Sequence, residues 1–127
     1  MTYQIIPAKD SAYNRHILEQ KKGIILVGLE QNNEKDNPKY LSSGLNSIIA
    51  RIASKNNNKI GINLETLQDK TKIEKARLLA RIAQNIKICR EAGTCIAIHG
   101  EKDRDSMREF LSSLGASTSQ SSQAISF

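Results

Sequence analysis

Hydrophobic residues along the chain form short continuous runs that alternate with stretches of helical spacing. The continuous runs predict strands at residues 4–8, 24–27, 59–64 and 94–99. The run Ile24–Val27 has no polar alternation, which is typical of a strand buried on both faces in a parallel sheet. Between the strands, apolar residues recur every three or four positions, as in helices packed on a sheet. They predict helices at about 11–21, 44–56, 71–92 and 103–115.

Local signals place the ends of these helices. Asp10 or Ser11, Ser42 or Ser43, and Asp103 or Asp105 are predicted N-caps, because their side chains accept hydrogen bonds from free backbone N–H groups. Thr71 and Glu74 have the spacing of a capping box. Residues 30–40 are polar and predict a loop. In the second helix the predicted inward positions are Leu45, Ile48, Ile49, Ile52 and Ala53, and in the third they are Ala76, Leu79, Ile82, Ala83, Ile86 and Cys89.

This alternation of strands and helices predicts an α/β fold with a parallel sheet and right-handed crossovers. The periodicity leaves two arrangements open, an open three-layer sheet or part of a (β/α) barrel. The 127 residues support a single domain, predicted at 1–115. Residues 116–127 are rich in Ser and Gln and are predicted to form a ragged helix or a disordered tail.

Composition narrows the class of partner. The chain has a net charge of +6 and a sequence pI near 9.5, which favours an anionic partner such as nucleic acid. Aromatic residues make up only 4%, which argues against stacking of single-stranded bases. Two cysteines are too few for a disulfide scaffold. Without a secretory signal or an apolar run of membrane length, the expected location is the cytoplasm.

Catalytic motifs are sparse. Neither a glycine-rich phosphate loop nor a G-x-S-x-G nucleophile elbow follows any predicted strand. His99 lies at the C-terminal end of a predicted strand, where α/β proteins place active groups, and Glu30 and Asn63 follow two other strands. These residues suggest a hydrolytic metal site only weakly, because such sites draw several His and carboxylate ligands together. We therefore expect no catalytic residue, no metal ligand and no cofactor bound by this chain.

Basic residues at helical spacing are the stronger signal. Arg51 and Lys55 are four residues apart, and Arg77 and Arg81 repeat this spacing on the longer helix, with Lys87 and Arg90 further along. Residues four apart project from the same side of a helix, so each pair could reach successive phosphates. The alternative is a solvated helix face in which Glu74 pairs with Arg77 or Arg81.

Several segments together resemble the ribonuclease P protein component 3 family, the barrel-shaped protein subunit of archaeal and eukaryotic nuclear ribonuclease P. The resemblance covers most of the chain, and Gly44-Leu45-Asn46 with Ala76-Arg77-Leu78-Leu79-Ala80 is its most specific part. The other matching segments are residues 10–15, 24–26, 49–56, 60–64 and 85–90, with looser matches at the strand 94–99 and at 107–115 and 124–126.

The resemblance implies a partial TIM-like (β/α) barrel of the polymerase-and-histidinol-phosphatase type. It also implies a role in tRNA processing, as a subunit of the ribonucleoprotein endonuclease that cleaves the 5′ leader from precursor tRNA. In that hydrolase the RNA performs the chemistry with magnesium, while protein subunits stabilise the RNA. The implied partners are ribonuclease P RNA, a small α/β protein subunit and, indirectly, precursor tRNA. The implied RNA-binding residues are the basic residues of the matched segments: Arg15, Arg51, Lys55, Arg77, Arg81, Lys87 and Arg90.

The chain is shorter at its N-terminus than members of that family. Four or five strands cannot close an eight-stranded barrel. The sequence leaves three explanations open: a minimal version, a fragment whose remainder is encoded elsewhere, or a half-barrel that dimerises. It also leaves two alternative functions open, a metal-dependent phosphoesterase on the same barrel and a non-catalytic protein-interaction module.

Overall fold

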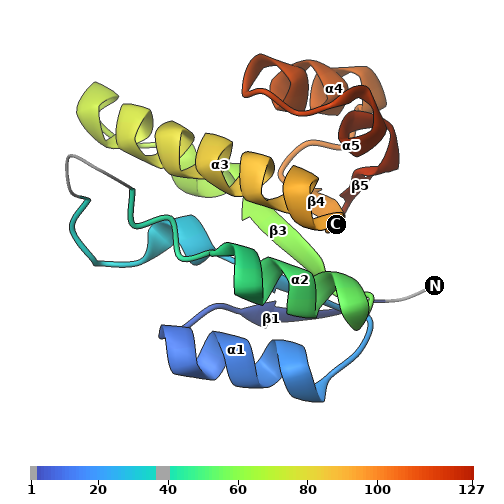
Figure 1. The fold of residues 1–127 in the computed structure, drawn as a ribbon. Coiled ribbons are helices and arrows are strands. Elements are labelled where there is room, and N and C mark those ends of the chain that lie inside the picture. Colours follow the sequence, from blue (N-terminus) through green and yellow to red (C-terminus); the bar gives the residue numbers. More distant parts are fainter. Residues whose placement is uncertain (1–2, 37–40) are drawn as a thin grey trace.

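The computed structural model describes residues 3–36 and 41–127 and contains a sheet of five parallel strands. The strands are β1 (Gln4–Pro7), β2 (Ile24–Val27), β3 (Lys59–Asn63), β4 (Ile96–His99) and β5 (Ile125–Ser126). They lie side by side in the order in which they occur in the chain (Figure 1). The fold is therefore α/β with a parallel sheet, as predicted. Residues 37–40, the end of the predicted 30–40 loop, lie outside the described part of the chain, as do residues 1–2.

Helices connect the strands. They are α1 (Ser11–Gln20), α2 (Ser47–Lys55), α3 (Lys72–Ala92), α4 (Arg104–Ser113) and α5 (Thr118–Gln123), with short 3-10 turns at Leu29–Gln31 and Leu64–Leu67. Asp10, Thr71 and Asp103 cap their helices as predicted, each accepting from a backbone N–H. The Thr71 hydroxyl also donates to the Glu74 carboxylate, 3.0 Å away. Thus each of the three helices begins where its capping side chain predicts.

The start of α2 differs from the prediction. Neither Ser42 nor Ser43 is its N-cap. Asn46 caps the helix, with its Oδ1 2.9 Å from the Ile49 nitrogen. Gly44 separates the serines from the helix: it has a positive φ of 84°, and a Cβ there would lie 2.5 Å from the Leu29 carbonyl oxygen. This close approach requires glycine and a non-helical backbone.

The molecule has two layers, so the three-layer alternative is wrong. Apart from Leu78, the buried apolar side chains of the helices join one core with alternate residues of the strands. In the middle of the sheet these inward residues are Leu26, Ile60 and Ile98, and from the helices Ile49, Ile82 and Leu111 pack against them. In Figure 1, α1, α2 and α3 lie in front of the sheet. A parallel sheet whose strands follow chain order, with right-handed crossovers, places its helices on one face in this way.

Residues 116–127 pack against the rest of the fold as helix α5 and strand β5, so of the two predicted alternatives the helix is found and the disordered tail is not. Ser117 and Gln120 form a capping box at the start of α5. Ala124 is fully buried, and Ile125 pairs with Ala97 of β4. These contacts explain why a Ser- and Gln-rich segment is ordered: its few apolar residues lie where the sheet needs a fifth strand.

Candidate nucleic-acid interface

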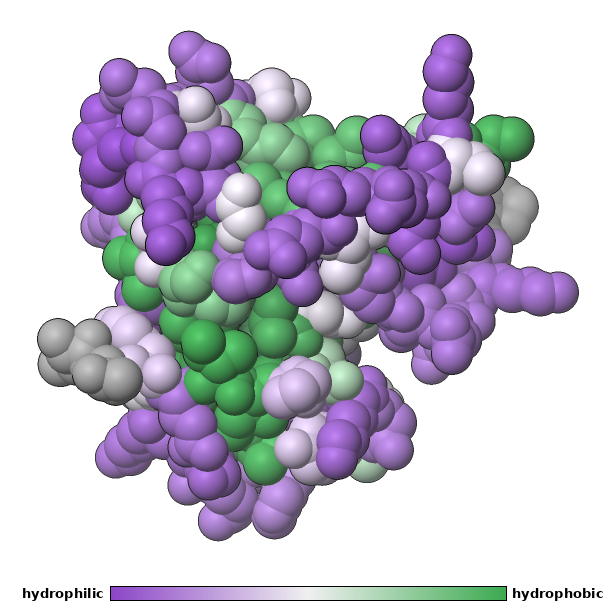
Figure 2. Space-filling model, turned by 180° about the vertical axis from the view of Figure 1, so that it is seen from behind, coloured by the Kyte–Doolittle hydropathy of each residue, from purple (hydrophilic) through white to green (hydrophobic). Residues whose placement is uncertain are grey.

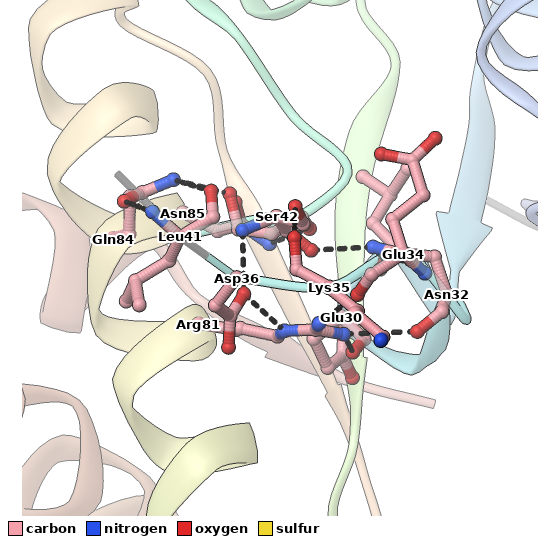
Figure 3. A network of polar contacts seen from close by, with 12 residues as sticks. Glu30, Asn32, Glu34, Lys35, Asp36, Leu41, Ser42, Arg81, Gln84 and Asn85 are labelled. Carbon is pink, nitrogen blue, oxygen red and sulfur yellow. Dashed lines mark hydrogen bonds and ion pairs between the residues drawn. The ribbon is translucent and has the colours of Figure 1, made fainter. Parts of the chain in front are cut away.

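Arg81 does not lie on an outward face with Arg77, as the sequence predicted. Its side chain is only 2% exposed. Its Nε lies 3.1 Å from Asp36 Oδ1, and Nη1 and Nη2 donate to the carbonyl oxygens of Glu30, Asn32 and Glu34 at 2.9, 2.9 and 2.6 Å (Figure 3). Buried carbonyl groups need donors, and a guanidinium can satisfy several at once. Arg81 therefore anchors the segment after β2 to α3.

The inward side of α3 is rotated from the predicted one. Its buried residues are Leu78, Arg81, Ile82, Asn85, Ile86 and Cys89, whereas Ala76 is exposed. Gln84 and Asn85 bind the segment that precedes α2: Gln84 donates to the Leu41 carbonyl and the Ser43 hydroxyl, and Asn85 to the Ser43 carbonyl. The matched Gly44-Leu45-Asn46 segment thus has structural roles, since Gly44 contacts Leu29, Leu45 is buried and Asn46 is a cap.

Glu30 is the buried carboxyl beside Arg81. It is 1% exposed, and burial raises its pKa above the ordinary value of 4.5, against hydrogen bonds and the Arg81 charge that lower it. Its Oε1 has no hydrogen-bond partner among the described residues. The sequence singled out Glu30 only as a polar residue after a strand, and the polar stretch around it gave no sign that this carboxyl is buried.

Two more of the predicted RNA-binding arginines have intramolecular partners but remain exposed. Arg15 forms an ion pair with Glu19 at 2.6 Å. Arg90 donates to the carbonyl oxygen of Gly115 at 3.0 Å. Such exposed contacts hold a side chain only weakly, so both arginines can still reach a partner.

Arg51, Lys55, Arg77 and Lys87 are exposed, and no ion pair is found for them within residues 3–36 and 41–127. Arg51 and Lys55 lie on α2. Arg77 belongs to a larger group, the basic end of α3, which we define as Lys70, Lys72, Lys75 and Arg77. All four are exposed, and the first buried residue of the helix is Leu78.

The basic end of α3 has the features of a phosphate-binding surface. In Figure 1 the start of α3, in yellow-green, extends beyond α2. The helix dipole adds positive potential at this end. The Glu74 carboxylate, on the same turn, accepts a hydrogen bond from the Thr71 hydroxyl. Ile73, on the same end, is 83% exposed and available for contact with an apolar part of a partner. Lys70 and Lys72 were noticed in the sequence, but only the burial pattern shows that they group with Lys75 on one free helix end.

A cleft of about 1160 Å³ opens where β1 and β2 end and α1 and α2 begin. Lys9 and Lys87 line it, as do Asp10, Glu34 and Glu91, so its charge is mixed. Several of its amides are already used within the protein: Asn14 bonds the backbone N–H and carbonyl of Lys9. The cleft therefore offers fewer free groups to an anion than the basic end of α3.

His99 is held by other parts of the protein. Its Nε2 lies 3.0 Å from Glu65 Oε1 and its Nδ1 2.6 Å from the Phe127 carbonyl oxygen. Within the described residues, no group of three or more His, Cys, Asp or Glu side chains could hold a metal ion. The geometry gives no support to a hydrolytic metal site at this strand end.

Among the described residues no helix combines the length and the apolar character needed to cross a bilayer. Cys89 is buried in the core, which raises the pKa of its thiol to about 12 and leaves it unreactive at neutral pH.

Comparison with known proteins gives one informative relationship. Neither a protein-family model nor a curated protein matches the sequence. A protein chain in the cryo-EM structure of archaeal ribonuclease P with mature tRNA has a similar fold, with a TM-score of 0.74 and 26% sequence identity. The similarity covers 90% of this chain and 49% of that chain, so this protein spans about half the length of its structural neighbour.

Proposed function

We propose that this protein is a subunit of ribonuclease P, the ribonucleoprotein that removes the 5′ leader from precursor tRNA. The single observation that carries the proposal is the structural match to a protein chain of the archaeal complex, at a TM-score of 0.74 and 26% identity. The sequence resemblance described above supports the same assignment independently of the overall fold.

In this proposal the chain binds and stabilises the catalytic RNA and performs no chemistry itself. The basic end of α3 and the α2 pair Arg51 and Lys55 are the main phosphate contacts, and the exposed Lys87, Arg15 and Arg90 are further ones. Arginine and lysine bind phosphate oxygens without reading sequence, which suits a subunit that supports a folded RNA. Arg81 is excluded from this role because its guanidinium is already bound within the protein. Magnesium is used by the RNA of the complex.

The strand order supports a further part of the proposal, a partial TIM-like barrel of the polymerase-and-histidinol-phosphatase type. Parallel strands in chain order with helices on one face form the repeating pattern of a (β/α) barrel. The proposed partners are ribonuclease P RNA, a small α/β protein subunit and, through the complex, precursor tRNA. The proposed location is the cytoplasm.

The test is reconstitution of precursor-tRNA cleavage from the RNA and the protein subunits over a magnesium series. Omission of this chain is expected to raise the magnesium concentration needed for cleavage. The variant Lys72→Gln/Lys75→Gln/Arg77→Gln should reproduce most of that effect. A matched control, Lys21→Gln/Lys22→Gln/Arg108→Gln, removes three exposed cations from other surfaces and should act like wild type. If omission leaves cleavage at low magnesium unchanged, the proposal is wrong.

Gel shift with ribonuclease P RNA separates this proposal from a plain interaction module. Phosphate binding weakens steeply with salt, by a slope of about 0.7–0.9 per phosphate neutralised in a plot of log affinity against log salt. The triple variant should lower the slope by about two to three units, whereas the control variant should leave it unchanged. An interaction module with a merely soluble surface would not bind the RNA specifically at any salt concentration.

A further inference from the structure

The basic end of α3 carries cations on two sides of the helix. Successive residues of a helix are about 100° apart around its axis. Lys72 and Arg77 are therefore separated by about 140°, and Lys75 lies beside Lys72. All three are exposed. The helix thus presents positive charge along both edges of one outward strip.

The strip between these edges carries only an isoleucine and small side chains in the first turns of the helix. Ile73, Ala76 and Ala80 lie in it, and all three are exposed, Ile73 by 83%. Leu78 and Ile82, which point to the opposite side of the helix, are buried. A methyl group projects little beyond the backbone, so a partner can approach the helix closely at the two alanines. The longer cationic side chains can then reach past the strip on either side.

The carboxylates near this end of α3 leave the strip positive. Glu74 lies outside it and is half-buried. Glu91 follows Ile73 by about five turns, which places it about 27 Å further along the helix axis. Glu34 and Asp36, in the neighbouring segment, form no ion pair with the cations of this end within residues 3–36 and 41–127. An anionic partner is therefore met by cations first.

Aromatic side chains give no platform for single-stranded bases. The sequence of α3 contains none. In the described part of the chain every aromatic residue is at least half-buried. Tyr3 and Tyr13 each lie against a lysine ammonium group, 5.3 and 4.6 Å from the ring centre. Proteins that bind single strands stack bases on exposed rings, so the surface is better suited to a duplex.

The back of the molecule offers a polyanion less than the basic end of α3 does. Figure 2, which views the molecule from behind, shows green hydrophobic residues across the middle between purple margins. Lys59 in β3 is only 8% exposed. RNA contact is therefore assigned to the side that carries the helices.

Double-stranded RNA has a groove that fits the strip. Its minor groove is wide and shallow, exposes ribose 2′-hydroxyl groups and is bordered by the phosphates of both strands. We propose, on the basis of the function proposed above, that the basic end of α3 binds double-stranded RNA. The strip with Ile73, Ala76 and Ala80 lies along the minor groove. Lys72 and Lys75 on one edge and Arg77 on the other contact phosphates of opposite strands.

The test is fluorescence anisotropy with an RNA duplex of about 20 base pairs that is unrelated in sequence to ribonuclease P RNA. One strand of it alone and a DNA duplex of the same sequence are the competitors. The RNA duplex is expected to bind at least about 10-fold more tightly than either. The single strand lacks the groove, and the minor groove of DNA is narrow and has no 2′-hydroxyl groups.

Two charge variants test whether both edges are used. Lys72→Gln and Arg77→Gln should each lower the salt slope of duplex binding by about 0.7–0.9, because each removes one phosphate contact. Lys22→Gln, which removes an exposed cation after α1, is the control and should leave the slope unchanged. A loss of slope in only one of the two α3 variants would contradict contact with both strands.

Ala80→Leu tests the close approach without changing charge. The larger side chain would hold the helix away from the groove, so duplex affinity should fall about 10-fold. The weak binding of the flexible single strand should stay the same. Leucine suits an exposed helical position almost as well as alanine, so the variant should fold, as circular dichroism can show. Ser119→Leu adds similar bulk to an exposed position of α5 and should bind the duplex like wild type.

The outcomes separate this inference from the proposed function. Equal affinity for the RNA duplex and the single strand, or duplex binding unchanged by Ala80→Leu, would overturn the inference. The proposed function stands in that case if ribonuclease P RNA is still bound and its cleavage still depends on this chain. Binding to neither the duplex nor ribonuclease P RNA would overturn both and would leave an acidic protein as the partner of the basic end of α3.

Discussion

Arg77 and Arg81 lie one turn apart on α3 and have opposite environments. Arg81 is buried against three carbonyl groups and a carboxylate of residues 30–36, whereas Arg77 is exposed among other cations at the free end of the helix. The side chains are chemically identical, so the difference comes from what lies opposite each one. Backbone carbonyl groups of residues 30–34 accept from Arg81, whereas within residues 3–36 and 41–127 no ion pair is found for Arg77. Basic residues on one helix thus divide into those that hold the fold and those left for a partner.

The strongest test of this difference is to replace each arginine in its own single variant and compare the stabilities. Arg81→Ala leaves three carbonyls and the Asp36 carboxylate without their donor, and should lower the free energy of unfolding by about 3–5 kcal/mol. Arg81→Lys keeps the charge but lacks the planar guanidinium group. Its free energy of unfolding should therefore lie between those of wild type and Arg81→Ala. Arg77→Ala should change stability by less than about 0.5 kcal/mol. Urea unfolding followed by circular dichroism measures all three, and equal effects of the two alanine variants would contradict the assignment.

Gly44→Ala tests whether the segment before α2 is as tightly placed as the Arg81 network implies. The new Cβ would meet the Leu29 carbonyl at 2.5 Å in a backbone with positive φ, so a loss of about 2–3 kcal/mol is expected from clash and strain together. Gly115→Ala is the control: its φ is also positive, at 96°, but no heavy atom lies within 4 Å of its Cβ. Thermal unfolding of both variants should show the larger loss for Gly44→Ala, and the reverse order would mean that the segment can move aside.

The pH dependence of stability gives a further test, because the carboxyl of Glu30 is buried beside Arg81. Its pKa is raised in the folded protein by burial, so the folded state holds the proton more tightly than the unfolded state does. The stability contributed by this group is complete below about pH 4.5 and is lost as the pH rises through the folded pKa.

Glu30→Gln removes this dependence and should be more stable than wild type at neutral pH, with a difference that shrinks as the pH falls toward 4.5. Glu34→Gln changes an exposed carboxyl of the same segment and serves as the control. Unfolding curves across this pH range give the result. A constant difference at every pH would show that burial of the charge is not its cause.

The smallest effect is expected for Arg77, the exposed arginine of the two. Arg77→Gln should lower the salt slope of RNA binding by about 0.7–0.9, the contribution of one phosphate, and leave the unfolding curve unchanged. Gel shifts over a salt series measure it. A slope equal to that of wild type would remove Arg77 from the proposed phosphate contacts.

The sequence predicted the order and type of the main elements because each depends on local spacing. The Thr71 cap and the buried run Ile24–Val27 are examples, since neighbouring residues decide both. Arg81 could not be placed in this way. Its partners lie 45 to 51 positions away, in a segment that had no pattern of its own. The helical stripe assigned it outward because arginine usually is exposed.

Ile48 shows the same limit of local spacing, but here a residue that was predicted to be buried is exposed. The helical period placed it inward, but it is 56% exposed, because α2 turns Ile49 and Ala53 to the core and leaves Ile48 at the edge of the stripe. In residues 116–127 the helix was one of the predicted alternatives, but the strand was not predicted, since only the pairing of Ile125 with Ala97 makes a strand of a segment with so few apolar residues. Local pattern gives the elements, and distant contacts decide which face each residue takes.

The order of the strands has a consequence for how the chain is assembled. Each strand pairs with the one that precedes it in the chain, so each new strand and helix add to a neighbour already in place. Contacts of short sequence separation favour rapid folding because little loop entropy is lost before they form. In a sheet with this strand order, a strand and its helix can also be added or removed at either edge without changing the path of the other connections.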